Sequence, residues 1–452
     1  MNTRWIHACL YILLAVICLP SAFAQESLSA YPAVIHIHST ISGALYPPSR
    51  IIRLAQDKGI KILVFTDSFL RRWEYGLPLV SNIFKLSAEE ASISRYGINH
   101  YLNDFKKIKD EFPDMLILEG AEVAPFYWWS GGILKKNLSL NDWSRHLLVI
   151  GLKKERDYRN LPVAYNKYFF PRPKDIPSLL IAAILVASGV FFLKSAFTGA
   201  KKKKAPGFLI CAAGILFLLN AIPFSASRYN PYRRQRHYLP YQELIDYVIK
   251  KDGLVFWAHP RITEEMSWGR FAKTVNFSTL KYPEVLTQTG GYTGFGIGAN
   301  RNLISAGDKW DDALNSYCEG RRVSPPWVIA EADYRGGTEI DSIQNMVFLK
   351  AFNEESVYEA LAAGRLYIRY YSKGKHDVLL DDFHIADSSA DSSGGRAFIA
   401  GEIMVKNKPR LFIRGSFPAS RSQELRLEVI RNGSIVKELN LTGRQEFDLE
   451  FQ

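Results

Sequence analysis

The feature that most constrains the fold is an alternation of short apolar strands and helices, which stops once and then resumes. It runs over 31–152 and again over 241–370. Ala33–His38 is one expected strand of the first part, and Asn353–Gly364, with Asn353 as N-cap, is an expected helix of the second. Such alternation favours a parallel α/β sheet or barrel. We therefore expect one α/β domain in two parts, interrupted by an insertion at 153–240.

The insertion contains two long apolar runs, 178–197 and 207–224. Each is about the length that crosses a hydrocarbon core of roughly 30 Å. Lys201–Lys204 lie between them, and short basic loops favour the cytoplasmic side. The sequence therefore predicts a two-helix transmembrane hairpin in the cell membrane, with its turn in the cytoplasm and both flanking parts on the exported side. A pair of buried core helices is the alternative.

The first 24 residues have the organisation of a secretory signal peptide. Arg4 gives a basic start, an apolar run spans Ala8–Leu19, and Ala22-Phe23-Ala24 provides a small-x-small ending. This pattern predicts cleavage after Ala24, and an uncleaved anchor is the alternative. Export would place the barrel in the periplasm or outside the cell.

The C-terminal part, 377–452, has a different pattern. Its expected strands, including Arg410–Arg414, Glu424–Arg431 and Ser434–Leu441, alternate by two and are joined by turns such as Asn432-Gly433. This pattern predicts a small all-β sandwich.

The charge balance suggests an acidic partner. The chain has 57 Lys and Arg against 45 Asp and Glu, a formal excess of +12. Such an excess suits nucleic acid, an anionic substrate or a membrane surface. Lys201–Lys204 and the arginine cluster at 228–236 account for part of it and would meet lipid head groups of the bilayer. We therefore expect no nucleic-acid partner, and the sequence does not indicate an oligomeric state.

Residues that can bind metal stand at the ends of several expected strands. His36 and His38 share one side of a strand, because side-chain direction repeats every two residues. The other polar residues at strand ends are Asp67, Glu122, His146, His259 and Asp333. Ligands that converge from several strand ends are typical of a barrel active site. Histidines and carboxylates without cysteine suit zinc, manganese or iron, and one carboxylate can bridge two metals.

This ordered set resembles the PHP superfamily, the polymerase and histidinol phosphatase hydrolases, over about 31–152 and 238–370. The motifs are Ile-His-Ile-His-Ser at 35–39, Phe-Thr-Asp at 65–67, Glu-Gly-Ala-Glu-Val at 119–123, His-Leu-Leu-Val-Ile-Gly-Leu at 146–152, Ala-His-Pro at 258–260 and Ala-Asp-Tyr-Arg at 332–335. The resemblance implies a distorted seven-stranded (β/α)7 barrel with up to three metals. Asn353–Tyr367, followed by a β module, is similar to an exported branch that includes carbamate- and ester-cleaving metallohydrolases.

The resemblance also implies roles for individual residues. The first metal would be held by His36, His38, Glu122 and Asp333. Glu122 would bridge to a second metal, which His146 and His259 complete. The third family metal has lost its ligands, because Ser42-Gly43-Ala44, Ser68 and Arg335 stand where the family has acids or imidazoles.

We therefore predict a site with two divalent metal ions, in which Arg335 supplies the positive charge of the missing third ion. Asp67 and Arg335 are predicted to take part in catalysis, and Arg145 and Arg261 to bind a small anionic or ester substrate. The reaction would be cleavage of a phosphoester or a carboxylic or carbamic ester by metal-activated water. The alternative is a catalytically degenerate sensor or binding module at the cell surface.

Two other motifs are less specific. Gly294-x-Gly296-x-Gly298 lacks the context and spacing of a dinucleotide-binding fingerprint and is predicted to be a loop. The aromatic run Phe126–Trp129 follows Glu122 and would line a substrate pocket, enter a membrane interface or pack internally.

Overall fold

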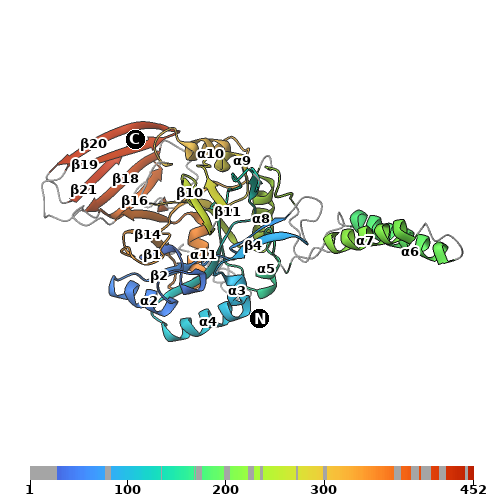
Figure 1. The fold of residues 1–452 in the computed structure, drawn as a ribbon. Helices are drawn as coiled ribbons and strands as arrows, with labels where there is room; N and C mark the ends of the chain where they lie inside the picture. Colours follow the sequence, from blue (N-terminus) through green and yellow to red (C-terminus); the bar gives the residue numbers. More distant parts are fainter. Residues whose placement is uncertain are drawn as a thin grey trace, which may run out of the picture.

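The structure is a computed structural model of the full chain (Figure 1). It describes residues 28–451 with these gaps: 77–82, 134, 167, 169–175, 198–203, 222–228, 235–237, 271–272, 299–302, 371–377, 388–396, 399–408, 417–423 and 443–445. The predicted signal peptide, 1–24, lies outside the described residues.

A nine-stranded sheet forms the centre of the molecule, in the order β13-β12-β9-β8-β5-β2-β1-β14-β15. Its strands are β1 (Ser29–Ile37), β2 (Ile62–Phe65), β5 (Leu116–Val123), β8 (Leu147–Ile150), β9 (Leu254–Trp257), β12 (Gly294–Ile297), β13 (Trp327–Ala330), β14 (Ile343–Leu349) and β15 (Leu366–Tyr370). The sheet therefore takes strands from both sides of the segment 153–240.

The sheet is nearly closed by backbone hydrogen bonds between β1 and the residues that follow β13. The amide of Ala332 donates to the carbonyl of Ile35 at 2.9 Å, and the amide of Tyr334 donates to that of His36 at 3.0 Å. In return, the amide of His38 donates to the carbonyl of Tyr334 at 2.9 Å. These bonds bring the segment after β13 beside the end of β1.

The strand directions correct the predicted seven-stranded parallel barrel. β1, β2 and β5 are mutually parallel, as are β9, β12 and β13, but β8 is antiparallel to both β5 and β9. β14 and β15 add further antiparallel pairs beside β1. Parallel neighbours need a long crossover, usually a helix. Between β5 and β8 the described residues form β6 (Trp128–Ser130) and β7 (Ser139–Asn141) and no helix, and β8 returns in the opposite direction.

Alternate residues of the strands enter two separate clusters of buried side chains. Ala33 and Ile35 pack with Ile62 in one cluster, whereas Val34 and Leu63 belong to the other. This period of two explains why the strand sequences are apolar throughout: both faces are covered. One cluster includes α11 (Glu354–Ala363), and the other includes α2 (Pro48–Asp57), α4 (Ile98–Glu111) and α8 (Leu239–Ile249).

The expected helix at Asn353–Gly364 is confirmed. The side chain of Asn353 accepts a hydrogen bond from the amide of Ser356 at 2.8 Å, and Gly364 ends the helix with φ +67°. Shorter helices complete this part of the chain: η1 (Thr40–Ser42), α3 (Ile93–Tyr96), α5 (Glu155–Arg159), α9 (Val285–Gln288) and α10 (Lys309–Cys318).

Two smaller sheets lie beside the central one. β3 (Arg72–Gly76) pairs with β4 (Lys85–Glu89), and β10 (Glu264–Arg270) with β11 (Lys273–Thr279) joins β7 and β6 in the order β10-β11-β7-β6. Tyr127 and Trp129 are buried in an aromatic cluster with Trp73, Trp143 and Phe277. Of the three readings of the run Phe126–Trp129, the structure therefore supports internal packing.

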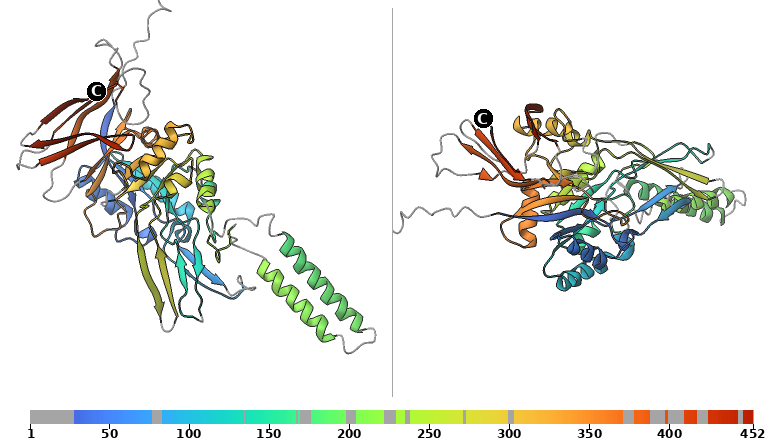
Figure 2. Two further views of the ribbon diagram at one scale, coloured as in Figure 1. Left: turned by 90° about the horizontal axis from the view of Figure 1, so that it is seen from above. Right: turned by 90° about the vertical axis from the view of Figure 1, so that its left-hand side faces the viewer.

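The apolar runs of the insertion form α6 (Ile176–Phe197) and α7 (Lys204–Ala221), which lie side by side and extend away from the rest of the molecule (Figures 1 and 2). Glycines let them approach closely: a Cβ on Gly189 would lie 2.5 Å from the amide nitrogen of Cys211. They are not core helices, because Phe191 is 68% exposed.

Within the part of the chain that the structure describes, no helix combines the length and the apolar character that crossing a bilayer requires. The predicted transmembrane hairpin is therefore wrong. The physical reason is that apolar runs of this length also form helices that bury side chains against one another, and hydropathy alone does not separate the two cases.

The C-terminal strands form two antiparallel sheets. β16 (Leu379–Asp387), β17 (Ala397–Phe398), β18 (Pro409–Ser416) and β21 (Glu446–Phe451) make one, in the order β17-β16-β18-β21. β19 (Glu424–Arg431) and β20 (Ser434–Thr442) make the other, and Asn432 and Gly433 turn between them with φ +52° and +76°. Ile413 of the first sheet and Leu441 of the second share one small buried cluster.

Candidate metal centre

The candidate ligands gather at one rim of the nearly closed sheet. His36 and His38 lie at the end of β1, Glu122 in β5, and His259 and Asp333 just after β9 and β13. β8 is antiparallel, so its beginning, not its end, reaches this rim. His146 immediately precedes β8 and therefore joins the others.

The backbone is strained where three of these ligands stand. His36, His259 and Asp333 have φ values of +72°, +33° and +40°. The pairing of β1 with β2 also shifts register between Ile35 and Ile37, around His36. Positive φ in a non-glycine residue costs on the order of 1–3 kcal/mol and persists only where the surroundings impose it. The fold therefore holds these side chains in orientations that ordinary strands would not give.

His36, His38 and Asp333 form the first ligand group. The Nε2 atoms of the two imidazoles lie 3.1 Å apart. The Oδ1 atom of Asp333 lies 3.7 Å from Nε2 of His36 and 3.4 Å from Nε2 of His38. Three ligand atoms thus converge from two separate segments of the chain.

Glu122, His146 and His259 form the second ligand group. The Oε1 atom of Glu122 lies 2.6 Å from Nδ1 of His146 and 3.4 Å from Nε2 of His259. Glu122 also reaches the first group, because its Oε1 is 3.3 Å from Nε2 of His36 and its Oε2 is 3.5 Å from Nε2 of His38. One carboxylate therefore contacts both groups, as a bridging ligand does.

Most of these separations fit metal coordination, whereas the 2.6 Å between Oε1 of Glu122 and Nδ1 of His146 has the length of a hydrogen bond. In a tetrahedral zinc site with bonds of about 2.0–2.2 Å, neighbouring ligand atoms lie about 3.3–3.6 Å apart. The separations in the first group, 3.1 to 3.7 Å, and the 3.4 Å between Nδ1 of His146 and Nε2 of His259 are close to this spacing. Imidazole nitrogens with carboxylate oxygens suit zinc, manganese or iron.

The carboxylates of the buried site favour positive charge beside them. Burial alone would lower the pKa of His36, but Asp333, Glu122 and Glu331 outweigh it and raise that pKa to about 10. Burial would raise the pKa of Glu122, yet the neighbouring histidines, His146 foremost, hold it well below its usual value. Burial lowers the pKa of His38 and of His146, which favours the neutral imidazole that a metal needs. A divalent cation would meet the same need for positive charge.

Three imidazoles are oriented through the ring nitrogen that faces away from the ligand atoms. Nδ1 of His36 faces Oε2 of Glu331 at 3.2 Å, and Nδ1 of His38 faces Oγ of Ser42 at 3.1 Å. Nδ1 of His259 faces the hydroxyl of Tyr282 at 3.3 Å, while that hydroxyl donates to the carbonyl of Ala258 at 2.6 Å. With Nδ1 as the donor in each ring, Nε2 is left to bind a cation.

Glu331 is the functional residue that the sequence analysis missed. It is buried, its Oε2 holds His36, and its Oε1 accepts the amide of His259 at 2.5 Å. It therefore touches one ligand from each group. Gly296 leaves room for this carboxylate, because a Cβ there would lie 2.4 Å from Oε2 of Glu331. Gly294–Ile297 is also the strand β12, so the loop predicted for these glycines is wrong.

Asp67 contacts the turn after β1. Its Oδ1 accepts the amide of Ser39 at 2.7 Å and the hydroxyl of Ser42 at 2.5 Å, and its Oδ2 accepts the hydroxyl of Ser39 at 2.9 Å. Ser42 in turn meets His38. Asp67 thus reaches the ligand groups through Ser42, and this arrangement suits positioning.

Ser68 and Arg335 both contact Glu122. The hydroxyl of Ser68 donates to Oε2 of Glu122 at 3.1 Å, and Nη2 of Arg335 lies 3.6 Å from the same oxygen. Arg335 also donates from Nε to Oδ1 of Asp333 at 3.1 Å and from Nη2 to Nε2 of His38 at 2.9 Å. Its guanidinium therefore lies among the ligand atoms of the first group.

The structure pairs Arg145 and Arg261 with other residues. Arg145 is buried, and its Nη2 lies 2.9 Å from Oδ1 of Asp142. Its Cζ lies 4.9 Å from the ring centre of Tyr282. Nη2 of Arg261 donates to Oδ1 of Asp308 at 2.9 Å. Neither contact is with the two ligand groups. Arg71 is nearer to the second group, because it lines one small hollow together with Glu122 and His146.

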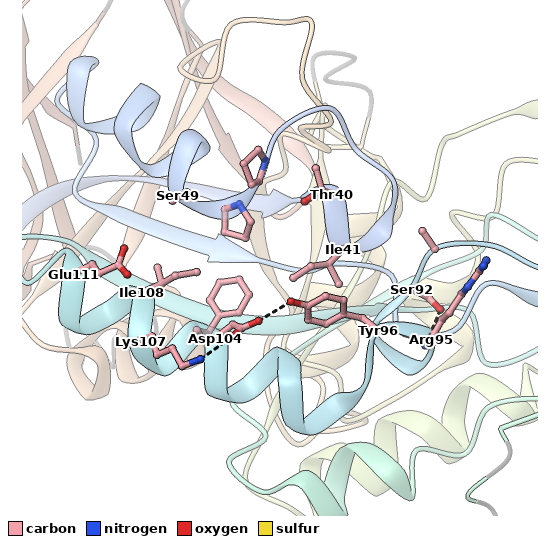
Figure 3. Close-up of a pocket in the computed structure, with 14 residues that line it drawn as sticks. Thr40, Ile41, Ser49, Ser92, Arg95, Tyr96, Asp104, Lys107, Ile108 and Glu111 are labelled. Carbon is pink, nitrogen blue, oxygen red and sulfur yellow. Dashed lines mark hydrogen bonds and ion pairs between the residues drawn. The ribbon is translucent and has the colours of Figure 1, made fainter.

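A small hollow opens beside the second group. It is lined by Ser68, Leu70, Arg71, Glu122, Ala124, Trp143 and His146. A larger hollow, about 610 Å³, lies between α2 and α4 (Figure 3). Its polar side chains bond to one another: Tyr96 donates to Asp104 at 2.6 Å, and Lys107 donates to Asp104 at 3.3 Å. None of the six candidate ligands lines this larger hollow.

Comparison with known proteins finds similar chains only among the solved structures. No model of a protein family matches the chain, and no curated protein matches its sequence. One similar solved structure is a two-domain protein from Bacteroides vulgatus ATCC 8482 containing a predicted PHP-like metal-dependent phosphoesterase, with 10% identity, a TM-score of 0.36, and coverage of 94% of this chain and 87% of that one. Another, described as a candidate metal-dependent phosphoesterase from Bifidobacterium adolescentis ATCC 15703, has 12% identity, a TM-score of 0.28, and coverage of 74% and 97%. Likenesses this distant carry no functional weight, so what the site can do follows from its side chains.

Proposed function

We propose that this chain is a metal-dependent hydrolase of the PHP type that cleaves a phosphoester or a carboxylic or carbamic ester. The observation that supports this most is the contact of Glu122 with both ligand groups. A carboxylate shared by two sets of imidazoles is the arrangement that holds two divalent ions side by side.

The proposed ligands divide as the groups do. His36, His38 and Asp333 would hold one ion and His146 with His259 the other, with Glu122 common to both. Two divalent ions, zinc, manganese or iron, would supply Lewis acidity and a water acidic enough to act as nucleophile near neutral pH.

The protein's own groups would do the rest. The hydroxyl of Ser68 orients Glu122 through its Oε2 atom. Glu331 orients the imidazole of His36, and Tyr282 orients that of His259. The Arg335 guanidinium, which contacts Glu122, Asp333 and His38, would bind an anionic oxygen of the substrate and offset charge that develops on it.

Metal analysis of the purified full chain tests this proposal. We expect about two ions per chain, with hydrolysis of p-nitrophenyl phosphate or p-nitrophenyl acetate. Glu122→Gln should lower both metal content and activity, since it removes the shared charge. The control is Asp104→Asn, which removes a carboxylate of α4 in the larger hollow, away from the ligand groups. It should leave metal content and activity unchanged. A wild-type chain that holds no divalent ion would contradict the proposal.

A second candidate function, a degenerate sensor or binding module, is favoured by one contact. Nη2 of Arg335 donates to Nε2 of His38, the atom that would face the first metal. If Arg335 blocks that group, Arg335→Ala should raise metal content above that of the wild type. If the chain is a hydrolase, the same variant should keep its metal content and lose activity.

We also propose that the chain is exported, on the pattern of residues 1–24 alone. Mass spectrometry of the mature protein should find an N-terminus at Gln25. A mature chain that retains Met1 would contradict cleavage.

A further inference from the structure

The small hollow beside the second ligand group is lined by a buried residue that carries an unsatisfied hydrogen-bond donor. The hollow is lined by Trp143 together with Glu122 and His146. Trp143 is buried, and its indole N–H has no hydrogen-bond partner among the described residues. Buried donors are almost always paired, so an unpaired donor on a residue that lines a hollow supports an acceptor supplied by a bound molecule.

Arg71 lines the same hollow and contacts Glu90 and Trp143. Its Nε donates to Oε2 of Glu90 at 2.6 Å, and its carbonyl accepts the amide of Glu90 at 2.9 Å. Its Cζ lies 5.5 Å from the ring centre of Trp143. Within the described part of the chain, these contacts leave both Nη groups of Arg71 without a hydrogen-bond acceptor. A fixed guanidinium with free N–H groups suits an anionic oxygen.

The hollow limits what can bind there. Its volume is about 10 Å³, which is room for about one water-sized group. One oxygen atom of a substrate fits, whereas an alkyl or aryl group does not. The donors beside it, Arg71 and Trp143, select an oxygen that carries negative charge.

We propose that Arg71 and Trp143 bind one anionic oxygen of the substrate beside the second ligand group and so determine a preference for anionic over neutral esters. This inference rests on the proposed hydrolase function. It places a second guanidinium near Glu122, in addition to Arg335.

The test uses the full chain with inorganic phosphate as the probe, in metal-loaded and metal-free protein, by calorimetry. Arg71→Met should weaken phosphate binding roughly tenfold or more, and Arg71→Lys less, because it keeps the charge but not the planar donors. Trp143→Phe keeps a ring and should weaken binding roughly threefold to tenfold. The matched control is Arg95→Met, which removes an arginine of α3 in the larger hollow. This variant should bind phosphate as the wild type does.

The activity readout separates charge recognition from structural support. Arg71→Met should lower kcat/KM for p-nitrophenyl phosphate through KM and leave p-nitrophenyl acetate nearly unchanged. Equal losses with both esters, or phosphate binding within twofold of the wild type, would overturn the inference. If the wild type binds no metal, the hydrolase proposal fails, and the inference about Arg71 is then decided by phosphate binding to the metal-free protein.

Discussion

Glu331 connects the two ligand groups at the level of single atoms, and Gly296 leaves the space it needs. The carboxylate holds the ring of His36 and the amide of His259. Any side chain at position 296 would enter that space, because a Cβ there lies 2.5 Å from the carboxyl carbon of Glu331. The glycine in β12 is thus explained by the residue that directly follows β13.

We expect Gly296→Ala to weaken metal binding by about 10- to 100-fold, the usual cost of disturbing a carboxylate that orients a ligand. Titration calorimetry with Zn²⁺ or Mn²⁺ measures this. Gly290→Ala, where a Cβ would meet nothing within 4 Å, is the control. Adding Glu331→Asp should restore part of the affinity, since the shorter side chain withdraws from the added methyl. An unchanged metal affinity in Gly296→Ala would contradict the role given to Glu331.

The sequence identifies the ligand types well but not the residues that support them. The structure brings all six predicted ligands into two groups. It does not bring Arg145 and Arg261 to them, because adjacency along the chain says little about where a long side chain points. Glu331 was missed because a single carboxylate two residues before Asp333 has no pattern of its own. The pairing of Glu331 with Gly296 exists only in space.

Among the elements, β8 shows that the position of a ligand before or after a strand depends on the direction of that strand. The other strand-borne ligands lie at or near the carboxyl end of a strand, whereas His146 precedes β8. In an all-parallel barrel the beginning of a strand lies at the opposite rim from those ends. His146 can only join Glu122 if β8 is reversed, as it is. The prediction of alternating elements was sound, and the inference from alternation to parallel strands was not.

The cap of α11 offers a prediction about stability. Asn353→Ala should destabilise the protein by about 1 kcal/mol, because the amide of Ser356 loses its acceptor. Urea unfolding measures the change. Asn353→Asp keeps an acceptor oxygen and should cost much less, which makes it the control. Because α11 packs into the cluster that contains Ile35 and Val64, loss of the cap should lower the free energy of unfolding of the central sheet as well.

At the scale of the whole molecule, the six candidate ligands tie together strands from distant parts of the chain. His36 and Asp333 belong to segments that also share backbone hydrogen bonds. A cation bound to both would stabilise the closed sheet and would have no equivalent site in the unfolded chain.

Metal should therefore raise the free energy of unfolding. At a free metal concentration of 100 times Kd, the gain is about 2.7 kcal/mol for one site. Differential scanning fluorimetry with and without EDTA measures it as a shift in Tm. His36→Ala should remove much of the shift, whereas His100→Ala, on α4, should not. A Tm that does not respond to EDTA in the metal-loaded wild type would count against a site that joins these strands.

The closure of the sheet also has a consequence for synthesis on the ribosome. β1 is made first, but its hydrogen-bond partners at residues 332–334 and in β14 are made about 300 residues later. The last candidate ligand, Asp333, leaves the ribosome after more than two-thirds of the chain. The first ligand group is therefore incomplete during most of translation, and β1 must wait unpaired on that side. A cation can therefore occupy the first group only after Asp333 has been made, and it cannot guide the early steps of folding.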